Sequence, residues 1–263
     1  MANKSKIRGV QYAILVCCAL VFVVCAILLV KTLIGYAQAN SFYDQMTLDE
    51  IGQDEKDPPE AEELPARVLS LMASYRELKE TYPNIKGYIN IPALSISYPV
   101  GQWTDNEYYE KHLISGEENN SGSIFLDFRI ASTPMQAKNL ILYGHNMNDK
   151  SMFNRIRDLF EEDTFYSTRV EYICDDGVFI YDSLAIYVTY TDDPYYAYTF
   201  RDDATFDAFF RERAGLSWFP VEYEKTAPII TLVTCSNSAT KPNQRFVYQA
   251  RLTEAYTEFG EES

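Results

Sequence analysis

Residues 228–235 read PIITLVTC, and residues 245–252 read RFVYQARL. Both runs are short and rich in β-branched and aromatic side chains, and the stretch between them is polar and turn-prone. This is typical of a strand, a loop and a second strand. Six more runs of this kind follow Pro83, namely residues 85–91, 96–100, 122–128, 139–144, 168–174 and 177–190. About eight short strands in one domain favour a closed β-barrel or a β-sandwich.

Three segments show a helical spacing of apolar residues instead. Residues 62–81 repeat apolar side chains at steps of three and four, and residues 203–216 place phenylalanines on one face. Residues 151–160 predict a third helix with Ser151 as its N-cap. We expect the segments 151–160 and 203–216 to cover the β-domain.

The N-terminal segment predicts a membrane anchor. An uncharged apolar run covers residues 13–30, and about 20 such residues span a bilayer core. Basic residues precede the run and every acidic residue follows it, so the positive-inside rule predicts a cytoplasmic N-terminus. The alternative is a signal peptide cleaved near Ala37-Gln38-Ala39, but the run exceeds the usual length of about 7–15 residues. We therefore expect a single-pass protein of the cell membrane with an extracellular domain.

These features divide the chain into five parts. We expect a cytoplasmic tail at 1–9, the anchor at 10–37, an acidic spacer at 38–61, the folded domain at 62–256 and a C-terminal tail at 257–263.

Composition excludes several classes of function. A net charge of −15 argues against nucleic acid as a partner, because phosphate binding needs clustered Lys and Arg. The carboxylates show no metal-ligand spacing, so we expect neither a metal nor a cofactor. Three of the five cysteines lie in the anchor as apolar filler. The other two, Cys174 and Cys235, are too few for a disulfide scaffold, although one bridge between them stays open.

Three residues form a candidate constellation for nucleophilic catalysis. Cys235 ends an apolar strand, His145 follows another, and Arg245 begins the last long strand ten residues after Cys235. Side chains at strand ends beside loops can be held rigidly and still reach a substrate. A thiolate attacks, an imidazole transfers protons, and a guanidinium stabilises oxyanion charge. The alternative is a small buried thiol, a structural histidine and a solvated arginine.

Several motifs resemble one known family. TLVTC at 231–235 resembles the TLxTC signature of sortases, and Arg245 falls at the expected distance after it. LYGHNM at 142–147 with SMF at 151–153 resembles the histidine motif of class B sortases. The opening strands at 83–99, DNEYY at 105–109 and GSIFLD at 122–127 match the same class, and the resemblance covers residues 62–254.

The resemblance implies an all-β fold with helical additions. It is an eight-stranded barrel with an N-terminal helix and a helix inserted before the penultimate strand. It also implies a cysteine transpeptidase that cleaves a C-terminal sorting signal of a surface protein after Thr. The thioacyl intermediate is then resolved by an amine of peptidoglycan or its precursor.

By motif match, Cys235 is the nucleophile, His145 the general acid and base, and Arg245 the oxyanion stabiliser. The match also implies a substrate groove lined by Asn106, Tyr143 and Thr234. This sequence departs from the class B pattern at Glu110, Val233 and Asn237, which leaves the sorting motif open. His112 lies outside the catalytic signature and is interpreted as structural.

Other functions remain as alternatives. An L,D-transpeptidase would carry an S-H-G-C-x-R motif, which is absent, and a papain-like peptidase would place its cysteine before its histidine. A pilin-polymerising enzyme or a non-catalytic surface domain on the same barrel stays possible, since fold alone does not fix function.

Overall fold

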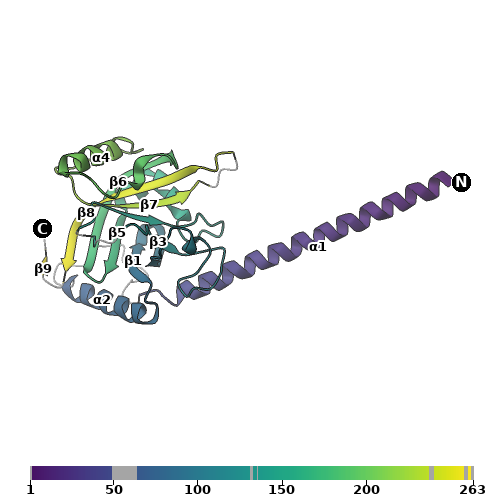
Figure 1. Ribbon diagram of the computed structural model, residues 1–263, viewed down its shortest axis with the longest axis horizontal. Coiled ribbons are helices and arrows are strands. Elements are labelled where there is room, and N and C mark those ends of the chain that lie inside the picture. The colour runs from purple at the N-terminus through teal and green to yellow at the C-terminus, as the bar shows by residue number, and fades with distance from the viewer. Residues whose placement is uncertain are drawn as a thin grey trace.

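The computed structural model describes residues 2–48, 64–130, 133–134, 136–236, 240–257 and 260–261 (Figure 1). Its strands are β1 (Ile85–Ile91), β2 (Ile96–Gly101), β3 (Ile124–Leu126), β4 (Asn139–Tyr143), β5 (Arg169–Cys174), β6 (Gly177–Tyr190), β7 (Ile229–Cys235), β8 (Gln244–Thr257) and β9 (Gly260–Glu261). They pair in the order β6-β5-β1-β2-β3-β4-β7-β8-β9, and a β6–β8 pairing closes the sheet. The closed barrel therefore has eight strands, as predicted, and β9 extends β8 outside it.

Two pairings in the barrel are parallel, β2 with β3 and β4 with β7. In the second pair, Tyr143 lies opposite Val233, so both strands end at the same edge of the barrel. The β7–β8 pairing is antiparallel, so β8 begins where β7 ends. The residues just after β4, at the end of β7 and at the start of β8 are thus brought together.

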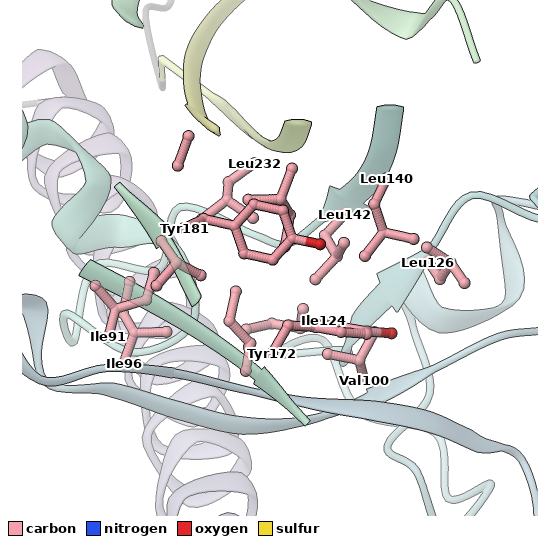
Figure 2. Close-up of a cluster of buried hydrophobic side chains, with 14 of the residues drawn as sticks. Ile91, Ile96, Val100, Ile124, Leu126, Leu140, Leu142, Tyr172, Tyr181 and Leu232 are labelled. Atoms are coloured by element: carbon pink, nitrogen blue, oxygen red, sulfur yellow. The ribbon is translucent and has the colours of Figure 1, made fainter. Parts of the chain in front are cut away.

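The inside of the barrel is filled by apolar and aromatic side chains. Figure 2 shows part of this core, which includes Ile91, Val100, Leu142, Tyr172 and Leu232, all buried. Burying such side chains is the main stabilising contribution to the fold. It also explains why these strands contain long apolar runs.

Helices cover the outside of the barrel. Helix α2 (Leu64–Thr81) buries Leu71 and Tyr75 against it. Helix α4 (Asp203–Gly215) buries its phenylalanine face, and the Asp202 side chain accepts a hydrogen bond of 2.8 Å from the Thr205 amide as an N-cap. Both helices match the expected positions.

The predicted helix at 151–160 is partly wrong. The segment forms a 3₁₀ helix, η3 (Asn154–Phe160), followed by the short α3 (Glu162–Ser167). Ser151 is not an N-cap, because Asp149 accepts hydrogen bonds from its amide at 3.1 Å and its hydroxyl at 2.6 Å. Residues 151–153 instead complete a turn in which Met152 has a φ of 56°. Three shorter 3₁₀ turns are η1 (Pro92–Leu94), η2 (Tyr108–Glu110) and η4 (Pro194–Tyr196).

Helix α1 (Ala2–Asp44) contains the apolar run and projects from the barrel in Figure 1. Its part Ile14–Asp44 is long and apolar enough to cross a membrane. The predicted spacer is corrected at its start. The helix continues to Asp44 and buries Ala39 and Tyr43 against the domain. Met46 and Leu48, which follow the helix, are buried as well. The rest of the predicted spacer, residues 49–61, lies outside the described residues.

Candidate active site

Cys235 and Arg245 lie directly opposite each other across the β7–β8 ladder. Both side chains are half-buried at the open end of their strands. Arg245 donates hydrogen bonds from Nη1 to the carbonyl oxygens of Pro242 and Gln244, each at 3.0 Å. Within the described part of the chain it forms no ion pair with a carboxylate, so its charge is not neutralised by a surface partner there.

His145 reaches the same edge through β4. The amide of Gly144 donates to the carbonyl oxygen of Val233 at 3.2 Å, which continues the β4–β7 pairing past the end of β4. The next residue after His145 strengthens this link, since Asn146 Nδ2 donates to the carbonyl oxygen of Cys235 at 2.8 Å. The loop that carries the histidine is therefore fastened to the backbone of the cysteine.

The imidazole of His145 is oriented by a backbone group. Its Nε2 lies 2.7 Å from the carbonyl oxygen of Glu110. A carbonyl oxygen can only accept a hydrogen bond, so Nε2 carries the hydrogen in this contact and Nδ1 is left as the basic nitrogen of a neutral ring. Asn237, one of the departures from the class B pattern, lies outside the described residues.

One cavity of about 260 Å³ joins these residues. Its lining consists of Asn106, Glu110, Phe125, Tyr143, Gly144, His145, Thr191, Tyr195, Val233, Thr234, Cys235 and Arg245. The three predicted catalytic residues and the three predicted groove residues all lie on it. The structure thus brings together six side chains that come from four separate parts of the sequence.

The predicted groove residues differ in their partners. Asn106 accepts a hydrogen bond at Oδ1 from the Phe128 amide at 3.0 Å. Thr234 is 2% exposed, and among the described residues its hydroxyl has no hydrogen-bond partner. Tyr143 donates from its hydroxyl to Asp127 at 3.0 Å. A buried hydroxyl without a protein partner is costly, so Thr234 is suited to bond a molecule in the cavity.

A buried ion pair supports Tyr143. The Asp127 side chain is fully buried and receives two hydrogen bonds from Arg129, of 2.8 and 2.7 Å. Burial opposes ionisation of this carboxyl, but the bonds from Arg129 outweigh it and lower the pKa of Asp127 below its usual value. Burial and the Asp127 charge raise the pKa of Tyr143. The tyrosine therefore stays protonated and keeps donating to the carboxylate.

The comparisons with known proteins agree with this geometry. The sequence model of the sortase domain matches residues 89–253. The chain belongs to the sortase family. A curated Sortase B of Listeria monocytogenes is 32% identical to this sortase over 181 residues, which are 67% of the chain and 73% of the relative. The predicted membership of class B is confirmed.

Solved structures of class B sortases share the barrel. A sortase B of Bacillus anthracis, in complex with AAEK1, is 26% identical to this sortase with a TM-score of 0.68. The match covers 84% of this chain and 99% of that one. A Staphylococcus aureus sortase B–substrate complex is 24% identical with a TM-score of 0.70, covering 84% of this chain and 98% of that one. The predicted barrel with helical additions is confirmed.

The cavity lining of this sortase includes six residues that were not predicted as site residues, namely Glu110, Phe125, Gly144, Thr191, Tyr195 and Val233. Thr191 and Tyr195 come from the loop between β6 and α4. Burial raises the pKa of Tyr195, and the nearby charge of Arg245 opposes that rise. The only sequence signal was a turn-prone Asp-Pro pair directly after a long strand, which indicates a loop but not the edge of the barrel on which it lies.

His112 and Cys174 lie away from this cavity. His112 stacks on the Tyr108 ring with centroids 4.1 Å apart, and its Nδ1 lies 2.7 Å from the Tyr108 carbonyl oxygen. Cys174 and Cys235 are both free thiols, so the open alternative of a disulfide between them is wrong. Among the described residues, no three His, Cys, Asp or Glu side chains are grouped to hold a metal ion.

Proposed function

We propose that this sortase is a cysteine transpeptidase that cleaves a C-terminal sorting signal after Thr and transfers the protein to an amine of peptidoglycan or its precursor. The observation that carries the proposal is the shared cavity, on which Cys235, His145 and Arg245 lie at the ends of neighbouring strands.

In the first step, the Cys235 thiolate attacks the carbonyl carbon of the threonine that precedes the cleaved bond. A C–S bond forms, and the carbonyl oxygen becomes an oxyanion beside the Arg245 guanidinium, which offers a planar set of donors. The C–N bond then breaks. The imidazolium of His145 gives its proton to the leaving amine, and a thioacyl enzyme remains.

In the second step, an amine from the cell-wall precursor attacks the thioester. His145 accepts a proton from the attacking nitrogen, a new amide C–N bond forms, and the Cys235 thiolate leaves. The histidine thus returns to its protonated form and the cysteine to its thiolate. Acid and base roles alternate on one residue, which fits a ring held in place by the Glu110 carbonyl.

The cavity walls support a peptide substrate. Thr234 offers a buried hydroxyl without a partner among the described residues, and Asn106 and Tyr143 add polar groups beside the aromatic ring of Phe125. The S. aureus relative has been solved as a substrate complex. We propose that Asn106, Tyr143 and Thr234 contact the sorting signal in this sortase.

The membrane is a further proposed partner of this sortase. The apolar helix supports a single-pass anchor, and the basic residues before it support a cytoplasmic N-terminus with the barrel outside. Surface proteins and peptidoglycan precursors are met on that outer side, which agrees with the proposed substrates.

The test is substitution of the nucleophile. The full chain in detergent is incubated with a sorting-signal peptide and an amine, and Cys235→Ala is expected to abolish both cleavage and transfer. Intact-mass measurement should show the thioacyl adduct on wild type. Cys174→Ala is the matched control, because it removes the other exported thiol. Turnover retained by Cys235→Ala would refute the proposal, and a chain that binds the peptide without cleaving it would be a non-catalytic surface domain.

A further inference from the structure

Residues 191–198 form one wall of the cavity, here called the pocket wall. It follows β6 directly and carries Thr191 and Tyr195 onto the cavity. Tyr195 is only 5% exposed, although it belongs to a surface loop. A loop of this kind needs specific bonds to hold an aromatic side chain in place, because loops are otherwise the most mobile part of a fold.

Asn139, at the start of β4, holds the pocket wall from the outer face of the barrel. Its Nδ2 donates to the carbonyl oxygens of Tyr195 at 3.0 Å and Ala197 at 2.7 Å. Its Oδ1 accepts from the Thr231 hydroxyl at 2.6 Å, and Gln249 donates to the same hydroxyl at 3.0 Å. Asn139, Thr231 and Gln249 are all fully buried, on the face of their strands opposite to that of Leu142 and Leu232.

A second set of bonds reaches the wall from α4. The Asp193 carboxylate accepts from the Tyr195 amide at 2.9 Å and from Arg213 at 2.5 Å. Arg213 is 1% exposed, and its guanidinium lies over the ring of Tyr187 at 5.9 Å. The Tyr187 hydroxyl lies 3.4 Å from Gln249 Oε1. The two sets therefore meet, and we call Asn139, Thr231, Gln249, Tyr187, Arg213 and Asp193 the buried polar chain.

Stability does not account for this arrangement. Buried polar and ionic networks often contribute no more to stability than apolar side chains of the same volume would. They can instead rigidify and specify one arrangement of the groups that they join. In this set, the polar atom left without a hydrogen-bond partner among the described residues is Arg213 Nε. Both ends of the buried polar chain bond the segment around Tyr195, which lies on the cavity. Its effect is therefore concentrated on one wall of the active site.

We propose that the buried polar chain positions Tyr195 and thereby sets the affinity of the cavity for the sorting peptide. This inference rests on the proposed function. The members of the chain are positioning residues, because they act through the pocket wall and do not reach the reacting atoms. Their loss should weaken substrate binding and leave the thiol chemistry in place.

Asn139→Asp tests the inference with little change of shape. The carboxylate keeps an acceptor for Thr231 but has no N–H group for the Tyr195 and Ala197 carbonyls. Single-turnover acylation of the full chain in detergent is measured against peptide concentration. We expect the half-saturating concentration to rise about tenfold, as for loss of buried hydrogen bonds, while the maximal rate changes little.

Asp193→Ala is the second variant. Its side chain is 17% exposed at the surface end of the chain, so the fold tolerates its removal better than a change at the fully buried Asn139. The same kind of effect is expected. Ser183→Ala is the matched control, because Ser183 bonds the Phe165 carbonyl at 2.6 Å and the Tyr248 hydroxyl at 2.7 Å but does not touch the pocket wall. It should lower the melting temperature without moving the half-saturating concentration.

Two outcomes are separable. If wild type forms no thioacyl adduct, the proposed function is wrong. If wild type forms the adduct, but Asn139→Asp and Asp193→Ala lower only the melting temperature and keep the half-saturating concentration of wild type, the buried polar chain is merely structural and this inference is overturned.

Discussion

The two thiols of the folded domain, Cys174 and Cys235, differ in their surroundings. Cys174 is buried at the end of β5, and burial raises its pKa to about 12. Because a thiolate is the reactive form, Cys174 stays inert at neutral pH. We expect iodoacetamide to label Cys235 first in the folded chain, and raising the pH from about 7 to about 9 should hardly speed labelling of Cys174. Peptide mapping measures both rates, and equal rates would contradict this account.

Arg245 lies opposite Cys235 and has no carboxylate partner in the described part of the chain. If it stabilises the oxyanion, Arg245→Ala should lower the acylation rate by about 10²–10³-fold. Arg245→Lys should restore only part of the rate, since lysine keeps the charge but loses the planar fork. Arg155→Ala is the control, because Arg155 pairs with Asp158 on the surface. Full rescue by lysine would indicate a merely electrostatic or structural arginine.

The two histidines, His112 and His145, should differ in their effect on activity. His145→Ala is expected to be inactive, because no other described imidazole lies on the cavity. His112→Ala should keep most of its activity, since its ring stacks on Tyr108 outside the cavity. Single-turnover acylation of both variants, with circular dichroism to check folding, measures the difference. Greater loss of chemistry in a folded His112 variant would exchange the two roles.

For single residues, the sequence predicted which side chains lie together on the cavity but not which contacts hold them there. Cys235, His145 and Arg245 follow from motifs at strand ends. The group that orients His145 is the backbone carbonyl of Glu110. Since every residue has a backbone carbonyl, the sequence does not mark this one. Tyr195 comes from a loop whose position depends on Asn139, far away in the sequence. Neither relation leaves a pattern in the residue types.

The hairpin between β5 and β6 depends on one glycine. Gly177 has a φ of 147°, and a Cβ there would lie 2.0 Å from the Tyr256 carbonyl oxygen. Gly177→Ala should therefore destabilise the domain by about 2 kcal/mol or more. Gly215→Ala, where nothing lies within 4 Å, is the control and should be nearly neutral. Thermal unfolding compares the two, and equal melting temperatures would contradict the steric argument.

Among the elements, long apolar runs were predicted best. The strands follow from alternating or continuous apolar residues, and the Asp175-Asp176 turn joins β5 to β6 as its sequence indicates. The segment 151–160 was predicted less well, because Asp149 takes both hydrogen-bonding groups of Ser151. The end of α1 was missed because its contacts are with loops of the barrel, such as the bond from Tyr43 to the Gly122 carbonyl oxygen at 2.9 Å.

The whole chain has a predicted direction in the membrane. With the N-terminus in the cytoplasm, protease added to intact protoplasts should digest a tag at the C-terminus and spare a tag at the N-terminus. Lysis should expose both tags. Immunoblots against each tag measure the result, and a protected C-terminal tag on intact cells would reverse the orientation.

Closure of the barrel could not be read from the sequence without the family resemblance. Eight strands fit a sandwich as well as a barrel, and the distinction is one long pairing between β6 and β8. Those strands lie far apart in the sequence, and their pairing depends on the twist and length of every strand between them.

Hydrogen bonds at the C-terminal end of α1 fix the position of the barrel relative to the apolar run. Asn119 donates to the Gly35 carbonyl oxygen at 3.1 Å, just where the apolar run ends, and Tyr43 is fixed to the barrel farther along the same helix. If the apolar run spans the bilayer, the cavity that holds Cys235, His145 and Arg245 lies at a fixed distance from the lipid. A surface protein that is itself held by a membrane segment would have to present its cleavage site at that distance from the bilayer. The distance between the cleavage site and the bilayer would then select substrates independently of the residues of the sorting motif.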